Sequence, residues 1–259
     1  MSNCRPLMND VYALLSPDQR HCLQGIGIRR WVIRTAVSDA TTIITDDTVT
    51  KEAVITETKA LPMEPEIKPS VIDQPLNDHA AINRAIQQCQ SCQLAQHCSQ
   101  KVPGVGNQQA GLMIVGEGPG HDEDIKGEPF VGRSGRLLDK MLAAIGINRA
   151  EIFITNIVKC RPPNNRDPLV DEVQACAPFL QAQIKQIKPK VILSVGRVSA
   201  HNLLRCSSPV GRLIQSIHQL PESDIPVKVT YHPAYLLRTP SAKAIAWQDM
   251  KTLHRILQQ

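Results

Sequence analysis

Beyond about residue 80, short apolar runs alternate along the chain with longer stretches in which apolar residues recur every three or four positions. Short apolar runs bounded by glycine or polar residues predict buried strands, and the three-to-four-residue repeat predicts amphipathic helices. The predicted strands cover residues 112–115, 152–155, 191–195 and 227–230, and the predicted helices cover residues 80–98, 134–145, 171–187, 198–204 and 241–257. This alternation predicts an α/β fold, a three-layer α/β/α sandwich with a four-stranded, mostly parallel sheet.

The N-terminal third of the chain has a different pattern. A Ser-Pro-Asp triplet at residues 16–18 has the order of an N-cap, a first-turn proline and an acidic first turn, so residues 1–35 are predicted to form a short helix and a docking peptide. Residues 36–79 are rich in Thr, Asp, Glu and Pro, which predicts a disordered linker. The folded domain is therefore expected to cover residues 80–259.

Charge is divided unevenly between these parts. Residues 1–80 hold 8 Lys and Arg against 11 Asp and Glu, whereas residues 81–259 hold 21 against 13. The predicted domain is therefore more basic than the whole chain, whose formal net charge is +5. Such an excess is typical of a surface that binds a polyanion, although a solvated basic surface without a partner gives the same count.

Simple features disfavour membrane and secreted proteins. No apolar run approaches the roughly 20 residues that span a membrane, and the first residues lack the basic-then-apolar pattern of a signal peptide. We therefore expect a cytoplasmic protein with no membrane partner. In that compartment, the 8 cysteines are expected to be metal ligands or free thiols and not disulfides.

Four of the cysteines are candidate ligands of a metal centre. Cys89 and Cys92 form a C-x-x-C pair, Cys160 follows the second predicted strand, and Cys176 lies in the third predicted helix. Two ligands from one turn and two from distant elements suit either Zn²⁺ or a [4Fe–4S] cluster. Cys98 is a rival ligand, and burial as small apolar residues is the alternative for all of them. The remaining cysteines have the pattern of ordinary thiols: Cys4, Cys22 and Cys206.

Three motifs stand where predicted parallel strands end. The glycine-rich run GEGPG at residues 116–120 follows the first strand, Asn156 ends the second, and His232 with Pro233 follows the fourth. Ligands of open α/β sheets bind at the carboxyl ends of the strands. We therefore expect the three motifs to line one binding site.

Each of these motifs has chemistry that suits a nucleobase. The glycine run allows a ligand to approach the backbone, and the Asn156 amide offers two donors and one acceptor that can read a base edge. A neutral His232 can donate a hydrogen bond to negative charge that develops on a leaving group. Phe130, one of 3 phenylalanines, either stacks on a base or packs in the core. The plain alternatives are a tight turn, a turn-capping asparagine and a structural histidine.

Three stretches together closely resemble the family-4, iron–sulfur type of uracil-DNA glycosylase. They are GEGPGHDEDIKGEPFVGRSGRLLDKML at residues 116–142, TNIVKCRPPNNRDP at residues 155–168 and YHPAYLLRTP at residues 231–240. The resemblance covers about residues 85–257 and keeps the motifs in order. It implies the uracil-DNA glycosylase fold and a DNA repair reaction, hydrolysis of the N-glycosidic bond of deoxyuridine in DNA, which releases uracil and leaves an abasic site. That bond is inaccessible within stacked bases, so the nucleotide has to flip out.

The resemblance also implies roles for residues of the pocket. Phe130 would stack on uracil, Asn156 would read its edge, and His232 would stabilise the uracil anion at O2. The group that activates water stays open, because the family-1 loop GQDPYH has an aspartate where this chain has a glycine. Glu117, an acid of residues 121–124, or no group at all can serve. The glycines expected to line the pocket are Gly116, Gly118 and Gly120.

Two further sets of residues follow from the same resemblance. The first would hold a [4Fe–4S] cluster with a mainly structural role: Cys89, Cys92, Cys160 and Cys176. The second would press into the minor groove and fill the space left by the flipped nucleotide: Tyr235, Leu236, Leu237 and Arg238.

Two features depart from the family pattern. Cys98 follows Cys92 by six residues, where the family has no third thiol. In the N-terminal region, LQGIGIRRWVIR at residues 23–34 is similar to the peptide with which the bacterial DNA polymerase III psi subunit docks on the clamp loader. This similarity implies that residues 16–34 tether the enzyme to the replisome, with chance as the alternative.

Three functions compete at this point. We prefer a monomeric uracil-DNA glycosylase that acts on uracil-containing DNA. The alternative is a non-catalytic, psi-like clamp-loader adaptor, against which the retention of Phe130, Asn156 and His232 argues. A zinc-stabilised DNA-binding module is the third, and it would lack the brown colour of an iron–sulfur protein.

Overall fold

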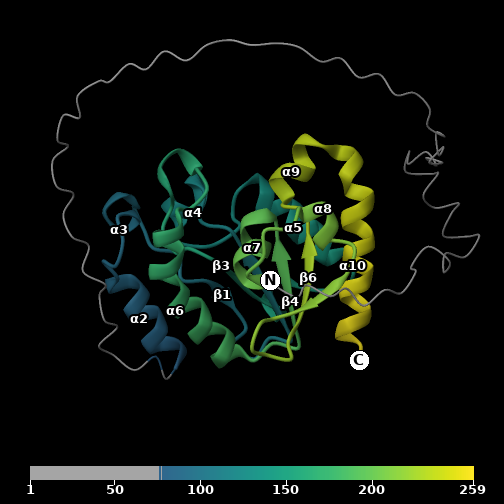
Figure 1. Ribbon diagram of the computed structural model, residues 1–259, viewed down its shortest axis with the longest axis horizontal. Coiled ribbons are helices and arrows are strands. Elements are labelled where there is room, and N and C mark those ends of the chain that lie inside the picture. The colour runs from purple at the N-terminus through teal and green to yellow at the C-terminus, as the bar shows by residue number, and fades with distance from the viewer. Residues whose placement is uncertain (1–75, 77) are drawn as a thin grey trace, which may run out of the picture. The chain divides into compact units, whose positions relative to one another are not determined.

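A computed structural model of the chain describes residues 76 and 78–259 (Figure 1). The predicted helix and docking peptide at residues 1–35, and most of the predicted linker at residues 36–79, lie outside the described residues. No helix in the described part is long and apolar enough to cross a membrane.

The described chain folds around one six-stranded sheet. The strands are β1 (Val105–Gly106), β2 (Leu112–Gly116), β3 (Phe153–Asn156), β4 (Val191–Val195), β5 (Ile217–Gln219) and β6 (Pro226–Thr230). The α-helices are α2 (His79–Gln88), α3 (Leu94–His97), α4 (His121–Lys126), α5 (Arg133–Ala143), α6 (Val170–Ile187), α7 (Arg197–Leu204), α8 (Val210–Leu213), α9 (Pro233–Arg238) and α10 (Lys243–Leu257). Three 3₁₀ turns join them: η2 (Arg149–Glu151), η3 (Pro163–Asn165) and η4 (Pro240–Ala242).

The strand order is β1-β3-β2-β4-β6-β5, and the four central strands are parallel. These are the four strands predicted from the apolar runs, so the α/β fold class is confirmed. The two edge strands are antiparallel additions that the apolar pattern did not predict. They have 2 and 3 residues and only partly covered side chains, too few positions to show a period.

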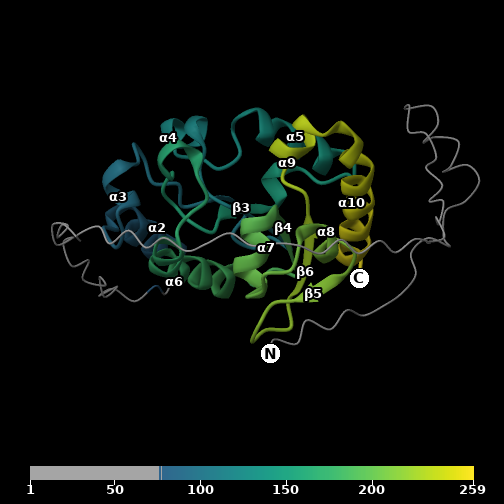
Figure 2. The same cartoon turned by 45° about the horizontal axis from the view of Figure 1, so that its top comes forward.

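Helices cover both faces of the sheet, as expected for three layers (Figure 2). Alternate residues of β2 point to opposite faces, because side chains in a strand alternate. Leu112 and Ile114 pack into a core with α5 and α10, whereas Met113 and Val115 pack into a core with α2, α6 and α7. All five residues of β2 are buried, as a central parallel strand requires.

The predicted helix at residues 80–98 is wrong in one respect, because it breaks after Gln88. Asp78 caps α2 by accepting a hydrogen bond from the Ala81 N–H at 2.7 Å, and the helix ends where Cys89 takes an extended conformation with ψ of 134°. A second short helix, α3, follows the turn. Cys89 and Cys92 therefore lie in and beside this turn and not on the shaft of one helix.

Candidate active site and cysteine cluster

Asn156 and Phe130 meet at Gly116, where β2 ends. Gly116 pairs with Asn156 across the parallel strands β2 and β3. A Cβ on Gly116 would lie 2.7 Å from Phe130 Cζ and closer still to Asn156 Oδ1. No side chain fits there, so glycine is required for these two groups to reach the end of the sheet. The predicted convergence of the first two motifs is therefore present.

Phe130 lies in a strained backbone conformation. Its φ is +54°, a left-handed value that bulky residues rarely adopt. Its ring is 6 % exposed and stacks against the His232 ring, with centroids 5.8 Å apart and planes at 28°. The sequence left core packing and base stacking open. In the structure the ring joins the α5–α10 core and also borders Gly116, Asn156 and His232.

Two charged residues hold the loop around Phe130. Glu123 Oε1 accepts hydrogen bonds from the N–H groups of Val131 at 2.9 Å and Gly132 at 3.0 Å. Arg149 donates to the carbonyl oxygens of Pro129 at 2.6 Å and Phe130 at 3.3 Å. Backbone strain persists only where the surroundings enforce it, and these contacts supply that constraint.

The Asn156 side chain is free for a ligand. It is 2 % exposed, yet within the described residues its amide group makes no hydrogen bond. The amide atoms are not among the fully buried, unpartnered side-chain atoms of the described residues, so they open onto the space around the end of β3. An incoming group with a complementary edge would satisfy the amide.

His232 is held in one orientation and one protonation state. Its Nδ1 accepts a hydrogen bond from the Ala234 N–H at 3.1 Å, so the neutral ring carries its proton on Nε2. Burial, aided by the positive charge of Arg238, lowers the pKa of His232 to about 4. Gly196, with φ of +92°, lets β4 pass close to the ring, since a Cβ there would lie 3.1 Å from His232 Cβ. A neutral Nε2–H donor is therefore present near neutral pH.

The acids near the glycine run differ in what they contact. Burial, together with the negative charge of Asp167, raises the pKa of Glu117 to about 7, against the opposing charge of Arg197. Glu123 Oε2 also accepts from the Gly120 N–H at 3.2 Å, and Asp124 accepts from Ser99 and Gln100. The carboxylates of Glu123 and Asp124 therefore accept hydrogen bonds from backbone N–H groups. Glu117, which directly follows β2, is the acid of this region whose pKa is raised.

Gly118 and Gly120, the other two glycines of the run, also have close neighbours. A Cβ on Gly118 would lie 2.8 Å from Val158 Cγ2, and one on Gly120 would lie 2.7 Å from Glu123 Oε2. Gly118 therefore packs against the segment that follows β3, and Gly120 begins α4.

The predicted DNA-contacting residues form most of α9, which begins directly after His232. Tyr235 and Leu237 are 38 % and 37 % exposed, and Arg238 is also exposed. Leu236 is 0 % exposed and packs against Ala242 and Ala246, so it faces the core and not the exposed side of the helix. One side of a short helix faces inward by geometry, and Leu236 occupies that side.

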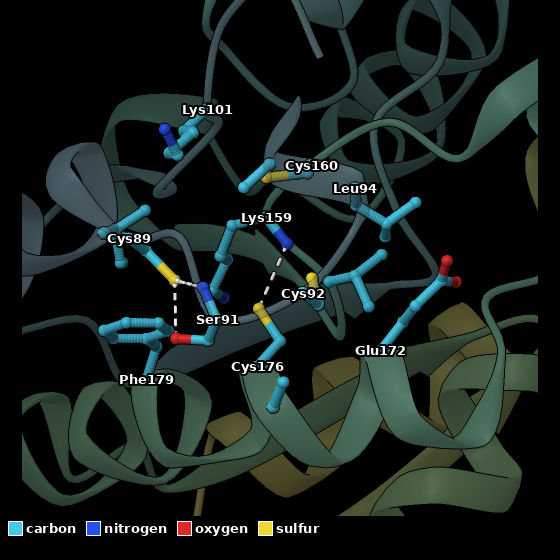
Figure 3. A pocket seen from close by; sticks show the side chains of 14 residues that line it. Cys89, Ser91, Cys92, Leu94, Lys101, Lys159, Cys160, Glu172, Cys176 and Phe179 are labelled. Atoms are coloured by element: carbon cyan, nitrogen blue, oxygen red, sulfur yellow. Dashed lines mark hydrogen bonds between the residues drawn. The ribbon is translucent and has the colours of Figure 1, made fainter. Parts of the chain in front are cut away.

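Four cysteines surround one cavity (Figure 3). Cys89 and Cys92 come from the turn after α2, Cys160 from the segment after β3, and Cys176 from α6. The space between atoms is about 330 Å³, part of it open to solvent. The other lining residues include apolar ones such as Ile86, Leu94 and Phe179, and four polar or charged ones: Ser91, Lys101, Lys159 and Glu172. The four predicted ligands are therefore brought together, and they lie on three separate segments.

Burial acts on the thiols of this cavity. It raises the pKa of Cys92, and it raises the pKa of Cys176 to about 11. The proximity of the Cys98 and Cys160 thiols lowers the pKa of Cys98 to about 7 and raises that of Cys160. Cys98 is not among the residues that line the cavity but lies next to one of them.

The geometry of the donor set bears on what it can hold. In the part of the chain that the structure describes, no three or more His, Cys, Asp or Glu side chains form a group that could hold a metal ion. Four thiols around a wider, largely apolar space suit a bulkier group that takes one sulfur at each of several metal atoms.

Three important residues were missed by the sequence interpretation. Glu123 and Arg149 hold the Phe130 loop, and Lys159 is a fully buried lysine beside the cysteine cavity. Glu123 stands three residues after Gly120, the spacing at which a glutamate side chain reaches back to the start of a helix, so it could have been found. Arg149 lies about twenty residues from its partners and gives no local signal.

Comparison with known proteins identifies the family of the chain. Residues 103–251 match the family described as the Uracil DNA glycosylase superfamily. The chain is 43% identical over 178 residues to the type-4 uracil-DNA glycosylase of Archaeoglobus fulgidus, which covers 66% of this chain and 89% of that protein. It is 40% identical over 166 residues to the type-4 uracil-DNA glycosylase of Thermotoga maritima, which covers 62% of this chain and 83% of that protein. A type-5 uracil-DNA glycosylase of Pyrobaculum aerophilum is 26% identical over 150 residues, covering 52% of this chain and 66% of that protein.

Proposed function

This chain belongs to the uracil-DNA glycosylase superfamily and is a uracil-DNA glycosylase of DNA repair, and we propose that it excises uracil in the pocket formed by Gly116, Phe130, Asn156 and His232. The observation that carries this assignment is the amide of Asn156, which makes no hydrogen bond among the described residues and lies beside Phe130 at Gly116, where a parallel strand ends. Ligands of such sheets bind at this edge. The reaction breaks the bond between C1′ and N1, and water adds at C1′.

The pocket supports recognition of a flipped base. Flipping costs unstacking energy, which contacts in the pocket repay. We assign Phe130 as the stacking face and Asn156 as the reader of the uracil edge, because a planar ring and an amide with both donors and an acceptor match a pyrimidine. The bare backbone at Gly116 leaves room for the base between them.

His232 is assigned to the leaving group. The bonding electrons move to uracil as the glycosidic bond breaks, so negative charge grows on its N1 and O2. The neutral Nε2–H of His232 would donate a hydrogen bond to O2 and stabilise this anion. Because the pKa of His232 is lowered to about 4, the ring stays neutral at physiological pH and does not transfer its proton.

Glu117 is assigned to the attacking water. Among the acids that the sequence offered, Glu123 and Asp124 are engaged by backbone N–H groups, and Asp122 is exposed in the first turn of α4. Glu117 lies on the loop that ends β2, and its raised pKa of about 7 lets the carboxylate accept a proton near neutral pH. It would orient the water and accept its proton as the C1′–O bond forms.

We assign DNA contact to the exposed side of α9, with Tyr235, Leu237 and Arg238. This helix starts at Pro233, so its residues leave the sheet beside the pocket. Two apolar or aromatic side chains and one cation at this place suit a wedge that enters the groove next to a flipped nucleotide.

Cys89, Cys92, Cys160 and Cys176 are assigned as the ligands of a [4Fe–4S] cluster. The four thiols line one cavity of about 330 Å³, and four cysteines are the donor set that a [4Fe–4S] cluster takes. Bound there, the cluster would supply covalent cross-links between α2, the segment after β3 and α6. Its role would be structural, because the cysteines join segments that lie far apart in the chain.

Excision from a uracil-containing oligonucleotide tests the assignment. The wild-type full-length chain should give alkali-sensitive breaks at uracil, and His232→Ala and Asn156→Ala should each lower the rate by about 10²–10³-fold. His254→Ala and Asn202→Ala are matched controls on α10 and α7 and should leave it unchanged. Wild-type activity that both pocket variants retain would place the chemistry elsewhere.

Other predictions from the sequence extend this proposal. Docking of residues 16–34 on a clamp loader falls outside the described residues and stays a prediction. The monomeric state and the cytoplasmic location are also kept as predictions.

A further inference from the structure

Lys159 is a buried cation between the cysteine cavity and the pocket. Its side chain is 2 % exposed. Nζ donates three hydrogen bonds, each 2.7 Å long: to Thr155 Oγ1, to Gln183 Oε1 and to the backbone carbonyl oxygen of Asn156. An ammonium group has three donors, so its hydrogen-bonding capacity is fully used. One of the three bonds ends on the residue that is assigned to read uracil.

None of these partners carries a negative charge. No carboxylate among the described residues forms an ion pair with Lys159. The one other buried lysine of the described domain, Lys228, is paired with Asp249 at 2.7 Å. A buried ammonium without a counter-charge is strongly unfavourable, so the neighbourhood of Lys159 is expected to contain an anion.

The cysteine cavity lies directly beside it. Lys159 lines the cavity, and its backbone N–H donates to Cys176 Sγ at 3.3 Å (Figure 3). Its sequence neighbour Cys160 lines the same cavity. Two other charged residues line the cavity: Lys101, which is partly exposed, and Glu172, which pairs with Arg166 at 2.6 Å. Four thiolates around a cluster would add negative charge there, and Lys159 is the buried cation placed to balance it.

We propose that Lys159 is a positioning residue that links the two sites: its charge balances the anionic cysteine cluster, and its hydrogen bond to the Asn156 carbonyl holds the end of β3 in register for uracil. The inference rests on the proposed function and on the proposed [4Fe–4S] cluster. The Lys159 side chain would then connect the cysteine cavity directly to Asn156, the residue assigned to read uracil.

Two variants separate the charge from the hydrogen bond. Lys159→Met removes both, whereas Lys159→Gln removes the charge and keeps a donor for the Asn156 carbonyl. Both variants, in the full-length protein, should lower the midpoint reduction potential of the cluster, because losing a nearby cation makes added negative charge less favourable. Lys159→Met should also slow excision by about 10²-fold, the cost of a small misplacement of a reacting or reading group. Lys159→Gln should recover most of that loss.

A double-mutant comparison tests the link to Asn156. The loss from Lys159→Met should largely vanish when Asn156 is already alanine, because coupled residues are not additive. Lys228→Met, which removes the other buried lysine, should be additive with Asn156→Ala and leave the potential unchanged.

The charge balance and the positioning role are tested by different outcomes. An unchanged potential in both Lys159 variants overturns the charge balance, and additive losses overturn the positioning role. If Lys159→Met does not fold, Lys159→Gln decides the charge balance by the same potential, and Lys159→Leu replaces Lys159→Met in the cycle with Asn156→Ala. A wild-type protein without excision or without iron defeats the proposed function itself, which these variants do not test.

Discussion

The backbone N–H of Ala234 donates a hydrogen bond to Nδ1 of His232 at 3.1 Å, and this contact decides which ring nitrogen faces the pocket as a donor. Both residues belong to the start of α9, where Pro233 fixes the backbone direction. The first turn of a helix leaves its N–H groups without partners inside the helix, and here the His232 ring satisfies one of them. Helix capping and preparation of the leaving-group donor are therefore one interaction.

His232 should stay neutral well below its ordinary titration range. Because the folded pKa is about 4 and the ordinary value is 6.5, the ring should keep its proton on Nε2 alone from pH 7 to about pH 5. The unfolded chain takes up a proton first, so the contribution of His232 to stability should fall as pH drops from 6.5 toward 4. Nitrogen NMR of the ring gives the tautomer and the pKa, with His254 as the internal comparison. A ring that titrates near pH 6.5 would contradict the assignment.

Excision should rise with pH through the pKa of Glu117. The carboxylate is raised from 4.5 to about 7, so the ionised form, which accepts the proton of water, grows between about pH 6 and pH 8. Single-turnover rates against pH should show this rise in the wild type and a flat, slower profile in Glu117→Gln. Asp167→Asn should move the inflection to lower pH, because Asp167 raises the pKa of Glu117. If the pH of the inflection were the same in Asp167→Asn as in the wild type, Glu117 would not be the group that titrates.

Gly116→Ala should close the pocket without unfolding the domain. The new methyl group would lie 2.7 Å from the Phe130 ring and closer to Asn156 Oδ1, so one or both must move. Displacement of these groups should lower excision by about 10²-fold. Gly111→Ala, just before the same strand, is the matched control, since its nearest neighbour would be 3.8 Å away. Melting temperature and excision rate are measured on both, and equal activity would show that the base does not use this space.

Arg149→Met should impair the pocket from a distance. It removes the donors to the Pro129 and Phe130 carbonyls, which help to hold the left-handed backbone of Phe130. We expect a rise in KM for the uracil substrate, because the stacking face is no longer preset. Asp139→Asn is the control: it weakens only the partly exposed ion pair with Arg149 and should change little. Equal effects of the two variants would mean that the ion pair, and not the contact with Phe130, matters.

Loss of any one cavity cysteine should reduce iron content. Cys89→Ala, Cys92→Ala, Cys160→Ala and Cys176→Ala should each lose the visible iron–sulfur absorbance and lower the melting temperature, because each breaks one attachment of the cluster. Cys206→Ala and Cys98→Ala should keep both, since neither residue lines the cavity. Iron analysis and the melting temperature are read on the same samples. If Cys98→Ala lost its iron and one of the four cavity variants kept it, Cys98 would be the ligand in place of that cavity cysteine.

Regular apolar patterns located the elements that carry the pocket. The runs at β2, β3, β4 and β6 were sufficient to predict the parallel core, because most buried positions of these central strands are apolar and short runs of this kind are easy to recognise. The edge strands β1 and β5 were missed because they are short and half-covered. The break after Gln88 was missed because the spacing of apolar residues predicts a helix but does not mark the residue at which the helix ends.

The sequence by itself determined that Gly116, Asn156 and His232 would share one edge, because strands in a parallel sheet end on the same side. Which side of α9 faces the core, and that Leu236 lies on it, was decided only by packing against Ala242 and Ala246. The partners of Arg149 and Lys159 were likewise decided by tertiary structure. The periodicity of apolar residues in the sequence indicates which positions are buried. A hydrogen bond between distant segments depends on how those segments meet in space, so it produces no periodic pattern in the sequence.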